Sequence, residues 1–324
     1  MKKILKVLIL WGILCAGGAF AQGYPAKSMT LVVPFTAGGP TDTIGRIMAE
    51  RMGRSLGQTI IVENATGAGG TIGVGRVVRA AADGYTLSIG HFGSHVIAGA
   101  VYPLKYDQLK DLEPVALITT NPQILVSRST LAFKDLKELI AWTRANGDKV
   151  SIGTGGAGTP AHVSAVYFNQ ATGSNAQIIH YRGSAPAMTD LFAGVIDLYF
   201  DQTATAVANT NARRVNAYAL TARSRLAAAK DVPTVDEAGL PGFYMSVWHA
   251  IWVPRSTPKP VIARLNDAIV DTLADPAVRK RLVTDMVQEI PPRDQQTPEY
   301  LGAHHKAETE KWWPLIKAAG IKAE

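Results

Sequence analysis

Short apolar runs rich in β-branched residues alternate with longer amphipathic patterns from residue 29 to residue 319 of the chain. The short runs predict strands at 29–34, 59–63, 86–90, 115–118, 123–127, 150–153, 176–181, 196–200, 215–221 and 245–253. The amphipathic patterns predict helices at 42–56, 72–82, 136–145, 160–172, 185–193, 260–273, 276–286 and 298–319. Regular alternation of this kind favours an α/β architecture with mostly parallel sheets.

Several predicted helices carry start and stop residues of their own. Gly57 and Gly173 follow the last helical positions, where a left-handed residue is favoured. Thr159 and Thr297 each precede a proline, which predicts an N-cap followed by proline at the first helical position. These residues therefore predict the end of the helix at 42–56, both limits of the helix at 160–172 and the start of the helix at 298–319.

Three glycine-rich segments each connect a predicted strand to a predicted helix, at residues 35–42, 67–71 and 153–160. Glycine lets the backbone approach a ligand closely, and a helix start offers free N–H groups where the helix dipole favours negative charge. The segments therefore predict a site for a carboxylate or a phosphate. Tight turns that bind nothing are the alternative interpretation.

The third segment also fits the dinucleotide pattern G-x-G-x-x-G at Gly153, Gly155 and Gly158. That pattern requires an acidic residue about 20 positions later to bind the ribose. Residues 169–188 contain no Asp or Glu, and neither of the other segments ends in the Lys-Ser/Thr of a P-loop. We therefore expect no nucleotide and no other cofactor.

The sequence carries no motif for catalysis, since G-x-S-x-G, H-E-x-x-H and S-x-x-K at a helix start are all absent. The histidines show no metal-ligand spacing on one element, so we expect neither an enzyme nor a metal site. Asp42 at a helix start is interpreted as a capping residue, or as a holder of a water or a ligand donor. His95 and His162 lie near glycine-rich segments, where ligand contact and packing both stay open.

The N-terminal residues have the layout of a secretory signal. Three lysines precede an apolar run at 7–14, and Ala19-Phe20-Ala21 supplies an A-x-A cleavage site. The run is shorter than the about 20 apolar residues of a spanning helix, which argues against a membrane anchor. We expect residues 1–21 to be a signal peptide cleaved near Ala21, and the mature protein to be periplasmic.

Removal of that segment changes the composition. Cys15 is the single cysteine and lies within it, so the mature chain has no thiol for a disulfide, a nucleophile or a metal. The formal net charge falls from +7 to +4 because Lys2, Lys3 and Lys6 are lost. The remaining basic residues form no stripe with aromatic residues, so we expect no nucleic-acid partner and a weak preference for anionic solutes.

Short motifs extend over nearly the full mature length. They comprise Tyr24-Pro25, residues 33–42 (VPFTAGGPTD), Arg46, and residues 62–70, 83–87, 106–115, 158–162, 181–187, 233–239 and 254–258. In their order and spacing they resemble the Bug family of periplasmic solute receptors, the binding subunits of tripartite tricarboxylate transporters. Each motif is common by itself, and their sequence along the chain makes the resemblance specific.

The resemblance implies an α/β, two-lobed, Venus-flytrap fold of the type II periplasmic-binding-protein class, with two mixed sheets flanked by helices. It implies a first lobe of residues 22–122 plus 247–324 and a second lobe of residues 123–246. It also implies a monomeric receptor that captures a small organic carboxylate, commonly a dicarboxylate, between the lobes. The membrane subunits of the transporter would be its partners.

The resemblance assigns the ligand contacts to segments of both lobes. Matched by motif, the ligand-binding residues are Phe35, Ala37, Gly39, Thr41 and Asp42 from the first lobe, Gly158, Thr159 and His162 from the second, Asp201 near the cleft, and Ser94 and His95 from a further loop. The chain departs from the family at Arg182, at His91-Phe92 and at His249. We expect these positions to influence which acid is accepted, with an aromatic dicarboxylate as one candidate.

Three other functions remain as alternatives. A periplasmic sensor would bind the same acid and pass the signal to a sensor kinase. An exported hydrolase would need a serine nucleophile, for which the sequence offers no motif. A DNA-binding regulator with a two-lobed effector domain would need a helix-turn-helix segment, which is absent from the sequence.

Overall fold

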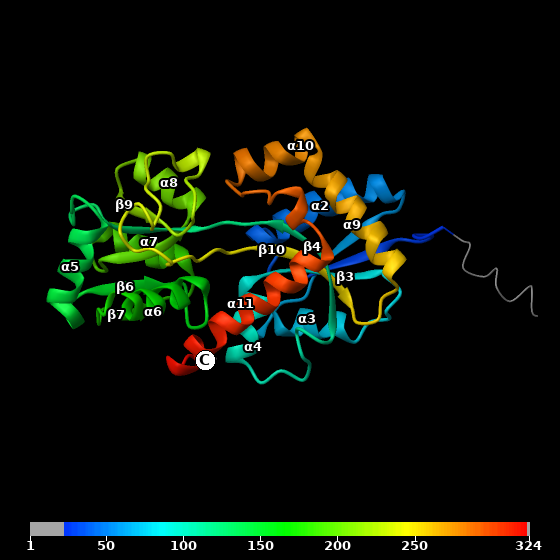
Figure 1. Cartoon of the computed structure of the whole chain (residues 1–324), viewed down its shortest axis with the longest axis horizontal. Coiled ribbons are helices and arrows are strands. Elements are labelled where there is room, and N and C mark those ends of the chain that lie inside the picture. The colour runs from blue at the N-terminus through cyan, green and yellow to red at the C-terminus, as the bar shows by residue number, and fades with distance from the viewer. Residues whose placement is uncertain (1–22, 323–324) are drawn as a thin grey trace, which may run out of the picture.

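The structure is a computed structural model that describes residues 23–322. Two lobes lie side by side along the longest axis of the molecule (Figure 1), and each lobe contains a five-stranded mixed sheet flanked by helices. The predicted signal peptide, residues 1–21, lies outside the described residues. Within residues 23–322, no helix combines the length and the apolarity needed to cross a membrane.

The sheet of the first lobe joins segments from both ends of the chain. Its strands, in spatial order, are β2 (Ile60–Asn64), β1 (Met29–Val33), β3 (Thr86–His91), β10 (His249–Pro254) and β4 (Leu112–Thr119). Strand β1 pairs in parallel with β2 and β3, whereas the returning strand β10 pairs antiparallel with β3 and β4. This insertion makes the sheet mixed: β2, β1, β3 and β4 run in one direction, as the alternation predicted, and β10 runs against them.

The sheet of the second lobe has the same mixed character. Its strands, in spatial order, are β7 (Gln177–His180), β6 (Ser151–Thr154), β8 (Leu198–Gln202), β5 (Gln123–Arg128) and β9 (Val215–Leu220). Strand β6 is parallel to β7 and β8, and β5 is antiparallel to β8 and β9. In both lobes, parallel strands therefore direct their carboxyl ends, and the turns that follow, toward one edge of the sheet.

Helices cover both faces of each sheet. The helices are α2 (Pro40–Leu56), α3 (Thr71–Val78), α4 (Ala98–Val101), α5 (Leu136–Asn146), α6 (Pro160–Thr172), α7 (Ser184–Ala193), α8 (Thr203–Asn211), α9 (Lys259–Ala274), α10 (Pro276–Arg279) and α11 (Pro298–Ala318). Short 3-10 turns span Ala68–Gly70, Gly147–Lys149, Ala227–Ala229 and Arg293–Gln295, and π turns span Gly93–Ile97 and Lys280–Asp285.

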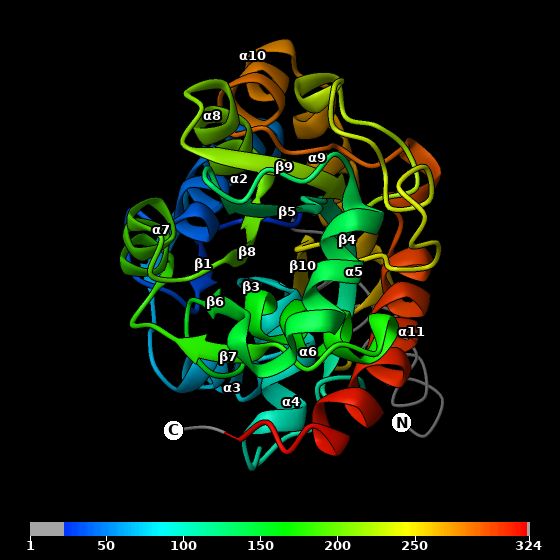
Figure 2. The same cartoon turned by 90° about the vertical axis from the view of Figure 1, so that its left-hand side faces the viewer.

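Apolar side chains of these helices form a core on each face of each sheet. In the first lobe, α2 and α9 bury one apolar stripe, and α3 and α11 pack on the other face beside Trp248 and Trp252. In the second lobe, α5 and α6 cover one face, and α7 covers the other together with Ala206 of α8. Figure 2 shows α7 and α8 on the opposite side of this sheet from α5 and α6.

All ten predicted strands are present, with limits shifted by up to a few residues. The predicted helix at 276–286 is the short α10 followed by a π turn, and α8 was not predicted. The N-caps at Thr159 and Thr297 and the left-handed C-caps at Gly57 and Gly173 are confirmed. Asp42 is not the cap of α2, because Gly39 is the N-cap and Asp42 lies within the first turn.

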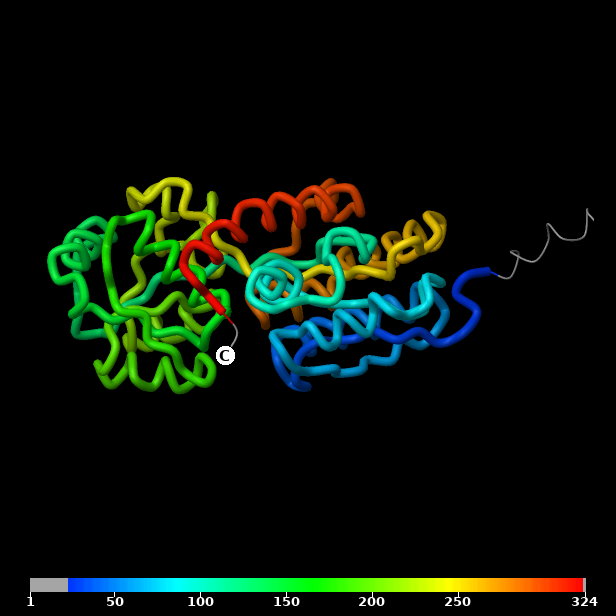
Figure 3. Tube along the Cα trace, turned by 90° about the horizontal axis from the view of Figure 1, so that it is seen from below, coloured from blue at the N-terminus to red at the C-terminus, as the bar shows by residue number. Residues whose placement is uncertain are grey.

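The chain crosses between the lobes in two segments that pair with each other. The amide of Asn121 donates to the carbonyl of Val247 (3.1 Å), and the amide of Val247 donates to the carbonyl of Asn121 (2.9 Å). Helix α11 also runs from the first lobe toward the second (Figure 3). Near its end, Lys311 Nζ donates to the carbonyl of Tyr244 at 2.9 Å. The predicted lobe limits at 122/123 and 246/247 lie at this crossing, and they stay a prediction.

Candidate ligand-binding cleft

A cavity of about 240 Å³ lies where the two lobes meet. It is lined by Phe35, Thr36, Gly39, Pro40, Thr41, His91, Pro160, Gln202, Val247 and His249. The turn after β1, the end of β3 and the start of β10 come from the first lobe, and the start of α6 and the end of β8 come from the second. The cavity is thus at the carboxyl ends of parallel strands, the usual ligand position in α/β proteins.

Two larger hollows, each about 740 Å³, lie within single lobes. One is between α9 and α11, and the other is beside α5 and β9. A third hollow, of about 430 Å³, lies between residues 226–228 of the second lobe and residues 279–290 of the first. None of the three contains a glycine-rich turn that leads into a helix. The smaller cavity between the lobes is therefore the better candidate site, since helix starts from both lobes converge on it.

Asp42 holds the first glycine-rich turn together. Its Oδ2 accepts from the Gly38 amide (2.8 Å) and from Arg46 Nε (2.9 Å), and its Oδ1 accepts from Asn64 Nδ2 (2.9 Å). Burial raises the pKa of Asp42, but the hydrogen bonds from Arg46, Gly38 and Asn64 and the Arg46 charge outweigh it, so the pKa lies below its usual value. Asp42 as a whole is 2% exposed. Its lone pairs are thus used to shape the turn.

The start of α2 leaves its amides to other partners. The N-cap is Gly39, so no side chain caps this helix. The first N–H groups of an α-helix have no acceptor within the helix. Because α2 is long and begins at the cavity wall, with Gly39, Pro40 and Thr41 all lining it, these amides and the helix dipole can receive an anion there.

The third glycine-rich turn is held by Thr159 and His162. Thr159 Oγ1 donates to the Gly156 carbonyl (2.8 Å) and accepts from the His162 amide (3.4 Å). The Gly158 amide donates to His162 Nδ1 at 3.0 Å. Burial, and to a lesser extent the neighbouring His180, lower the pKa of His162 to about 4. The ring is therefore neutral near pH 7 and carries its proton on Nε2.

Three rings from separate elements form the first-lobe side of the cavity. Phe35 stacks on His91 with ring centroids 4.4 Å apart and planes 8° from parallel. His249 meets His91 edge to face at 5.4 Å. Burial lowers the pKa of His91 to about 4. The pKa of His249 lies well below its usual value, mainly because the ring is buried and also because a second positive charge beside His91 would be repelled. Both imidazoles are therefore neutral at pH 7.

His91 and His249 were predicted to influence which acid is accepted, but they were not among the predicted ligand-binding residues, and both line the cavity. His249 Nε2 lies 3.2 Å from Thr41 Oγ1, and its Nδ1 lies 3.3 Å from Thr119 Oγ1. The available signal was positional, because His91 ends a strand and His249 begins the returning strand. Gln202, which follows Asp201 at the end of β8, was missed with no comparable signal.

The predicted site residues divide into two groups. Phe35, Gly39 and Thr41 line the cavity, and Ala37 and Asp42 belong to the same turn. Gly158, Thr159 and His162 flank Pro160, which lines the cavity from the second lobe. These eight residues are thus brought to the cavity or to the turns that form it, and their contact with a ligand stays a prediction.

Ser94 and His95 are instead enclosed in the first lobe, and each is 0% exposed. Ser94 Oγ lies 3.0 Å from His95 Nδ1, and the His95 ring stacks on Trp252 at 3.8 Å. Burial, then His305 and His91, lower the pKa of His95 well below its usual value. Neither residue lines the cavity, so ligand contact by this pair stays a prediction that the geometry does not favour.

Asp201 lies at the end of β8, next to the cavity but not on its wall. Its Oδ1 accepts from the Gln202 amide (2.8 Å) and from Thr205 Oγ1 (2.6 Å). Its Oδ2 is buried and makes no hydrogen bond with a described residue. Burial, only partly offset by these two hydrogen bonds, raises the pKa of Asp201 to about 6.

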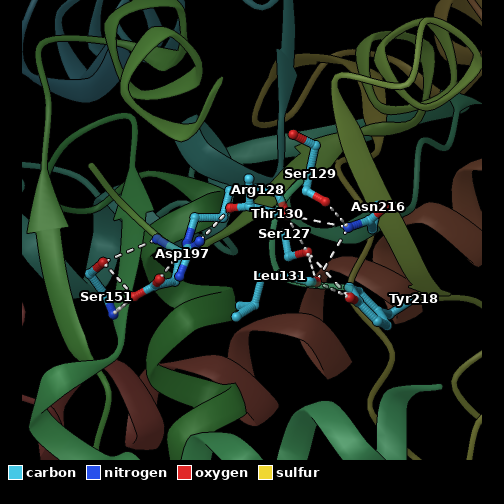
Figure 4. Close-up of polar contacts among 9 residues, drawn as sticks. All are labelled: Ser127, Arg128, Ser129, Thr130, Leu131, Ser151, Asp197, Asn216 and Tyr218. Carbon is cyan, nitrogen blue, oxygen red and sulfur yellow. Dashed lines mark hydrogen bonds and ion pairs between the residues drawn. The ribbon is translucent and has the colours of Figure 1, made fainter. Parts of the chain in front are cut away.

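A second polar cluster lies in the second lobe, beside the hollow at α5 and β9 (Figure 4). Arg128 Nε donates to Asp197 Oδ1 at 2.9 Å. Asn216 Nδ2 donates to three carbonyls of turn 128–131, and the Tyr218 hydroxyl donates to one of them at 2.6 Å. These hydrogen bonds use the polar groups of the cluster to fix the chain after β5. We therefore interpret the cluster as part of the lobe's structure and not as a ligand site.

Among the described residues, no group of three or more His, Cys, Asp or Glu side chains is arranged to hold a metal ion. The walls of the cavity consist of residues from both lobes. Those walls combine helix-start amides, threonine hydroxyls, neutral imidazoles and an aromatic ring, which suits a small ligand with hydrogen-bond acceptors.

Residues 44–321 match the family described as "Tripartite tricarboxylate transporter family receptor". The chain is similar to MatC (Rpa3494) from Rhodopseudomonas palustris, solved with bound malate, at 37% identity and TM-score 0.76, over 90% of this chain and 100% of that one. It is similar to R. palustris Rpa4515, solved with adipate, at 30% identity and TM-score 0.78, over 93% and 100%. Protein BugT of Bordetella pertussis is 31% identical, over 99% of each chain.

Proposed function

The chain belongs to the tripartite tricarboxylate transporter receptor family, and we propose that it binds a small organic carboxylate between its lobes and delivers it to the membrane subunits of such a transporter. The observation that carries the proposal is the convergence of two glycine-rich helix starts, one from each lobe, on a single cavity. The malate and adipate held by two similar receptors support the carboxylate class.

The proposed binding mode follows from the groups that the two turns offer. One carboxylate would accept from the uncapped first-turn amides of α2, around Gly39 and Thr41. The second lobe would contribute the segment Gly158–His162, where the neutral His162 can donate through Nε2. A hydrogen bond to a charged group contributes about 1.5–3 kcal/mol net. A ligand that bridges both turns thereby favours the arrangement in which the lobes enclose it.

The lobe limits and the cellular location are part of the same proposal. Residues 22–122 plus 247–324 would move as one lobe and residues 123–246 as the other. The paired crossing of Asn121 and Val247 would be the hinge. A signal peptide at residues 1–21 would deliver the receptor to the periplasm, where the transporter's membrane subunits are accessible.

Binding without turnover is the activity that the cavity supports. Among the residues that the structure describes, Ser94 and His95 form the one hydrogen bond between a serine and a histidine side chain, the kind of pair that a hydrolase uses, and both side chains are fully buried. A nucleophile must reach its substrate in a near-attack geometry, which enclosure in the core prevents. The receptor is therefore proposed to release its ligand unchanged.

A thermal-shift screen of the mature chain against mono-, di- and tricarboxylates tests the proposal. A ligand of the folded state stabilises it by mass action, by about 2.7 kcal/mol at one hundred times its Kd. We expect at least one dicarboxylate to raise the melting temperature and to be recovered unchanged after incubation. A screen in which no acid shifts the melting temperature, or in which a hit is consumed, contradicts the proposal.

A further inference from the structure

Helix α6 contacts the first lobe at a second place, away from the cavity. Its start lines the cavity through Pro160. Three side chains further along the helix, Val163, Val166 and Tyr167, pack against the apolar core of the first lobe, and Val163 is fully buried there. Residues three and four apart lie on the same face of a helix, so these side chains form one apolar stripe. One face of a second-lobe helix is thus covered by the first lobe.

Tyr167 is the centre of this contact. Its ring meets the ring of Trp312 in α11 edge to face, with ring centroids 5.2 Å apart and planes at 86°. Within its own lobe, the Tyr167 ring stacks on Phe243 at 4.6 Å, and its hydroxyl donates to the Gly242 carbonyl at 3.2 Å. Edge-to-face pairing is a favourable arrangement of two aromatic rings. Tyr167 therefore joins α6 to α11 while it is itself fixed in the second lobe.

Trp312 is fixed equally well in the first lobe. Its side chain is fully buried, and its Nε1 donates to Glu308 Oε2 at 3.1 Å. Its ring also meets Phe92 edge to face, with centroids 5.6 Å apart. Phe92 directly follows His91, which lines the cavity. The contact between α6 and α11 is thus supported by the part of the first lobe that also forms the cavity wall.

Lys311 adds a polar contact at the edge of this apolar one. Its Nζ donates to the Tyr244 carbonyl of the second lobe at 2.9 Å. The same atom lies 5.6 Å from the centre of the Tyr167 ring and 4.3 Å from the centre of the Trp312 ring. A cation within about 6 Å of an aromatic ring centre is attracted to the face of the ring. One side chain of α11 therefore contacts both rings of the pair and the backbone of the second lobe.

This contact differs in kind from the crossing between the lobes. At the crossing, Asn121 and Val247 are joined through their backbone amides and carbonyls, and the chain itself continues through them. The contact between α6 and α11 is made mainly by side chains of two helices that belong to different lobes (Figure 3). A rotation of one lobe about the crossing can keep the backbone hydrogen bonds, but it changes the packing of these side chains.

From this geometry we infer that Tyr167, Trp312 and Lys311 form a latch, which holds α6 against the first lobe before a ligand arrives and so positions the start of α6 opposite the start of α2. They are positioning residues, because none of them lines the cavity. The inference rests on the proposed binding of a carboxylate between the lobes and adds a means of setting its affinity. A receptor whose binding-competent arrangement is only partly populated binds with an affinity reduced by that fraction. A weaker latch should therefore weaken binding although no ligand contact is removed.

Tyr167→Ala tests the latch because it removes the ring that joins the two helices. In isothermal titration with the dicarboxylate found by the thermal-shift screen, with malate and adipate as the first probes, it should weaken binding about threefold to tenfold. Tyr167→Phe keeps the ring and should retain the affinity, and Lys311→Ala removes only the polar contact and should give a smaller loss. Trp142→Ala is the matched control, since it removes a half-buried ring that packs beside Phe133 within the second lobe, and it should leave the affinity unchanged.

The arrangement of the lobes can be measured directly in the ligand-free protein. Cys15 is the single cysteine, so the chain from residue 22 can carry two spin labels at introduced cysteines. Thr59→Cys in the first lobe and Thr189→Cys in the second place them at exposed positions. By electron paramagnetic resonance, Tyr167→Ala should lengthen the ligand-free distance between the labels, and a saturating concentration of the acid should restore the distance of the unsubstituted protein. Trp142→Ala should leave both distances unchanged.

The outcomes separate this inference from the function beneath it. If Tyr167→Ala changes neither quantity, or changes the affinity without the ligand-free distance or the distance without the affinity, the latch is wrong although the receptor binds its acid. If no acid binds the unsubstituted protein, the proposed carboxylate-binding function fails, and the ligand-free distance still decides whether this contact holds the lobes together. Circular dichroism checks that each variant is folded. If Tyr167→Ala does not fold, Lys311→Ala at the exposed Lys311 gives the same two measurements.

Discussion

Residues 38–42 and 158–162 begin α2 and α6 with the same layout in two different lobes. Each starts with a glycine at positive φ, +81° at Gly38 and +70° at Gly158, and each has proline at the first helical position. In each, the amide of the glycine donates to the side chain four residues later, Asp42 at 2.8 Å or His162 at 3.0 Å. The two lobes therefore build one backbone cradle with different side chains.

The differences concern charge and capping. The first turn is held by the ionised carboxylate of Asp42. Arg46 neutralises its charge, Asn64 donates a hydrogen bond to it, and no side chain caps the helix that follows. The second turn is held by a neutral imidazole and is capped by Thr159. The comparison teaches that a carboxylate can face both turns without a cationic side chain. One lobe offers uncapped amides, and the other offers a turn that carries no negative charge.

Asp42→Ala should have the largest effect, because it removes the acceptor of three hydrogen bonds in the first turn. Loss of a buried hydrogen-bonded charge should lower the free energy of unfolding by about 2–4 kcal/mol, measured by urea denaturation. It should also weaken binding of the acid found by the screen at least about tenfold, since the α2 amides lose their fixed positions.

Arg46→Ala is the matched control for that change. The Arg46 side chain is 51% exposed and that of Asp42 is 3% exposed, so Arg46→Ala removes one hydrogen bond and a charge partner but leaves the bonds from Gly38 and Asn64 to the carboxylate. Its cost should therefore be smaller than that of Asp42→Ala, which removes all three hydrogen bonds. If Asp42→Ala destabilises the protein no more than Arg46→Ala does, the carboxylate does not hold the turn, and the contrast between the turns loses its basis.

The pH dependence of stability should distinguish the two turns, and we expect this to be the second largest effect. The pKa of Asp42 is lowered from an already acidic value, so this group is ionised in the folded and unfolded states from pH 7 to pH 5 and adds no pH dependence there. The folded pKa of His162 is about 4 against 6.5 when unfolded. As the pH falls below 6.5, the unfolded chain takes up a proton that the folded protein refuses, so stability decreases.

His162→Gln should therefore reduce the slope of unfolding free energy against pH between 7 and 5, by up to about 1.4 kcal/mol per pH unit. Asp42→Asn should leave this slope unchanged, although it lowers stability at every pH. Asp201, with a folded pKa of about 6, takes up a proton in the folded state and acts in the opposite direction, so it is retained in both variants. Equal slopes for His162→Gln and the unsubstituted protein would contradict the neutral state of His162.

The sequence was informative about both turns because their backbone needs are local. Glycine at positive φ, proline at the first helical position and threonine at the N-cap of α6 are properties of adjacent residues. For the same reason the strands and most helices were predicted close to their positions. Helix α8 was missed because its sequence, TATAVANTN, is rich in poor helix formers, and packing such as that of the buried Ala206 stabilises it.

The long-range partners of the turns could not be predicted in this way. Asn64 reaches Asp42 because β2 pairs with β1, and His249 faces His91 because β10 enters antiparallel beside β3. The register of a strand that returns after more than a hundred residues depends on the whole sheet, and no local pattern records it. This is why His91 and His249 were noticed as unusual positions but not as neighbours in one cavity wall.

Thr159→Ala should remove the cap that distinguishes the second turn. Loss of a threonine N-cap typically costs about 1 kcal/mol of stability, here measured by urea denaturation. Calorimetry should also show weaker ligand binding, because the hydroxyl ties Gly156 to the start of α6. Thr159→Ser keeps the hydroxyl and should retain most of both properties. An unchanged affinity in Thr159→Ala would remove this residue from the proposed binding site.

Gly39→Ser should have the smallest effect on stability. It gives the first turn the kind of side-chain cap that the second turn already has, so it tests whether the missing cap matters for binding. Gly39 has φ −75° and ψ 169°, which serine adopts without strain, and an added Cβ would meet only the Thr36 carbonyl at 3.4 Å. The new hydroxyl can accept from a first-turn amide of α2, which should raise the free energy of unfolding by a few tenths of a kcal/mol. That amide is one that the ligand carboxylate is proposed to use, so affinity should fall while stability rises. Gly39→Ala adds the same Cβ without an acceptor and separates crowding from competition. A serine variant that gains stability and binds the acid as tightly as before would show that the free amides of α2 are not the carboxylate site.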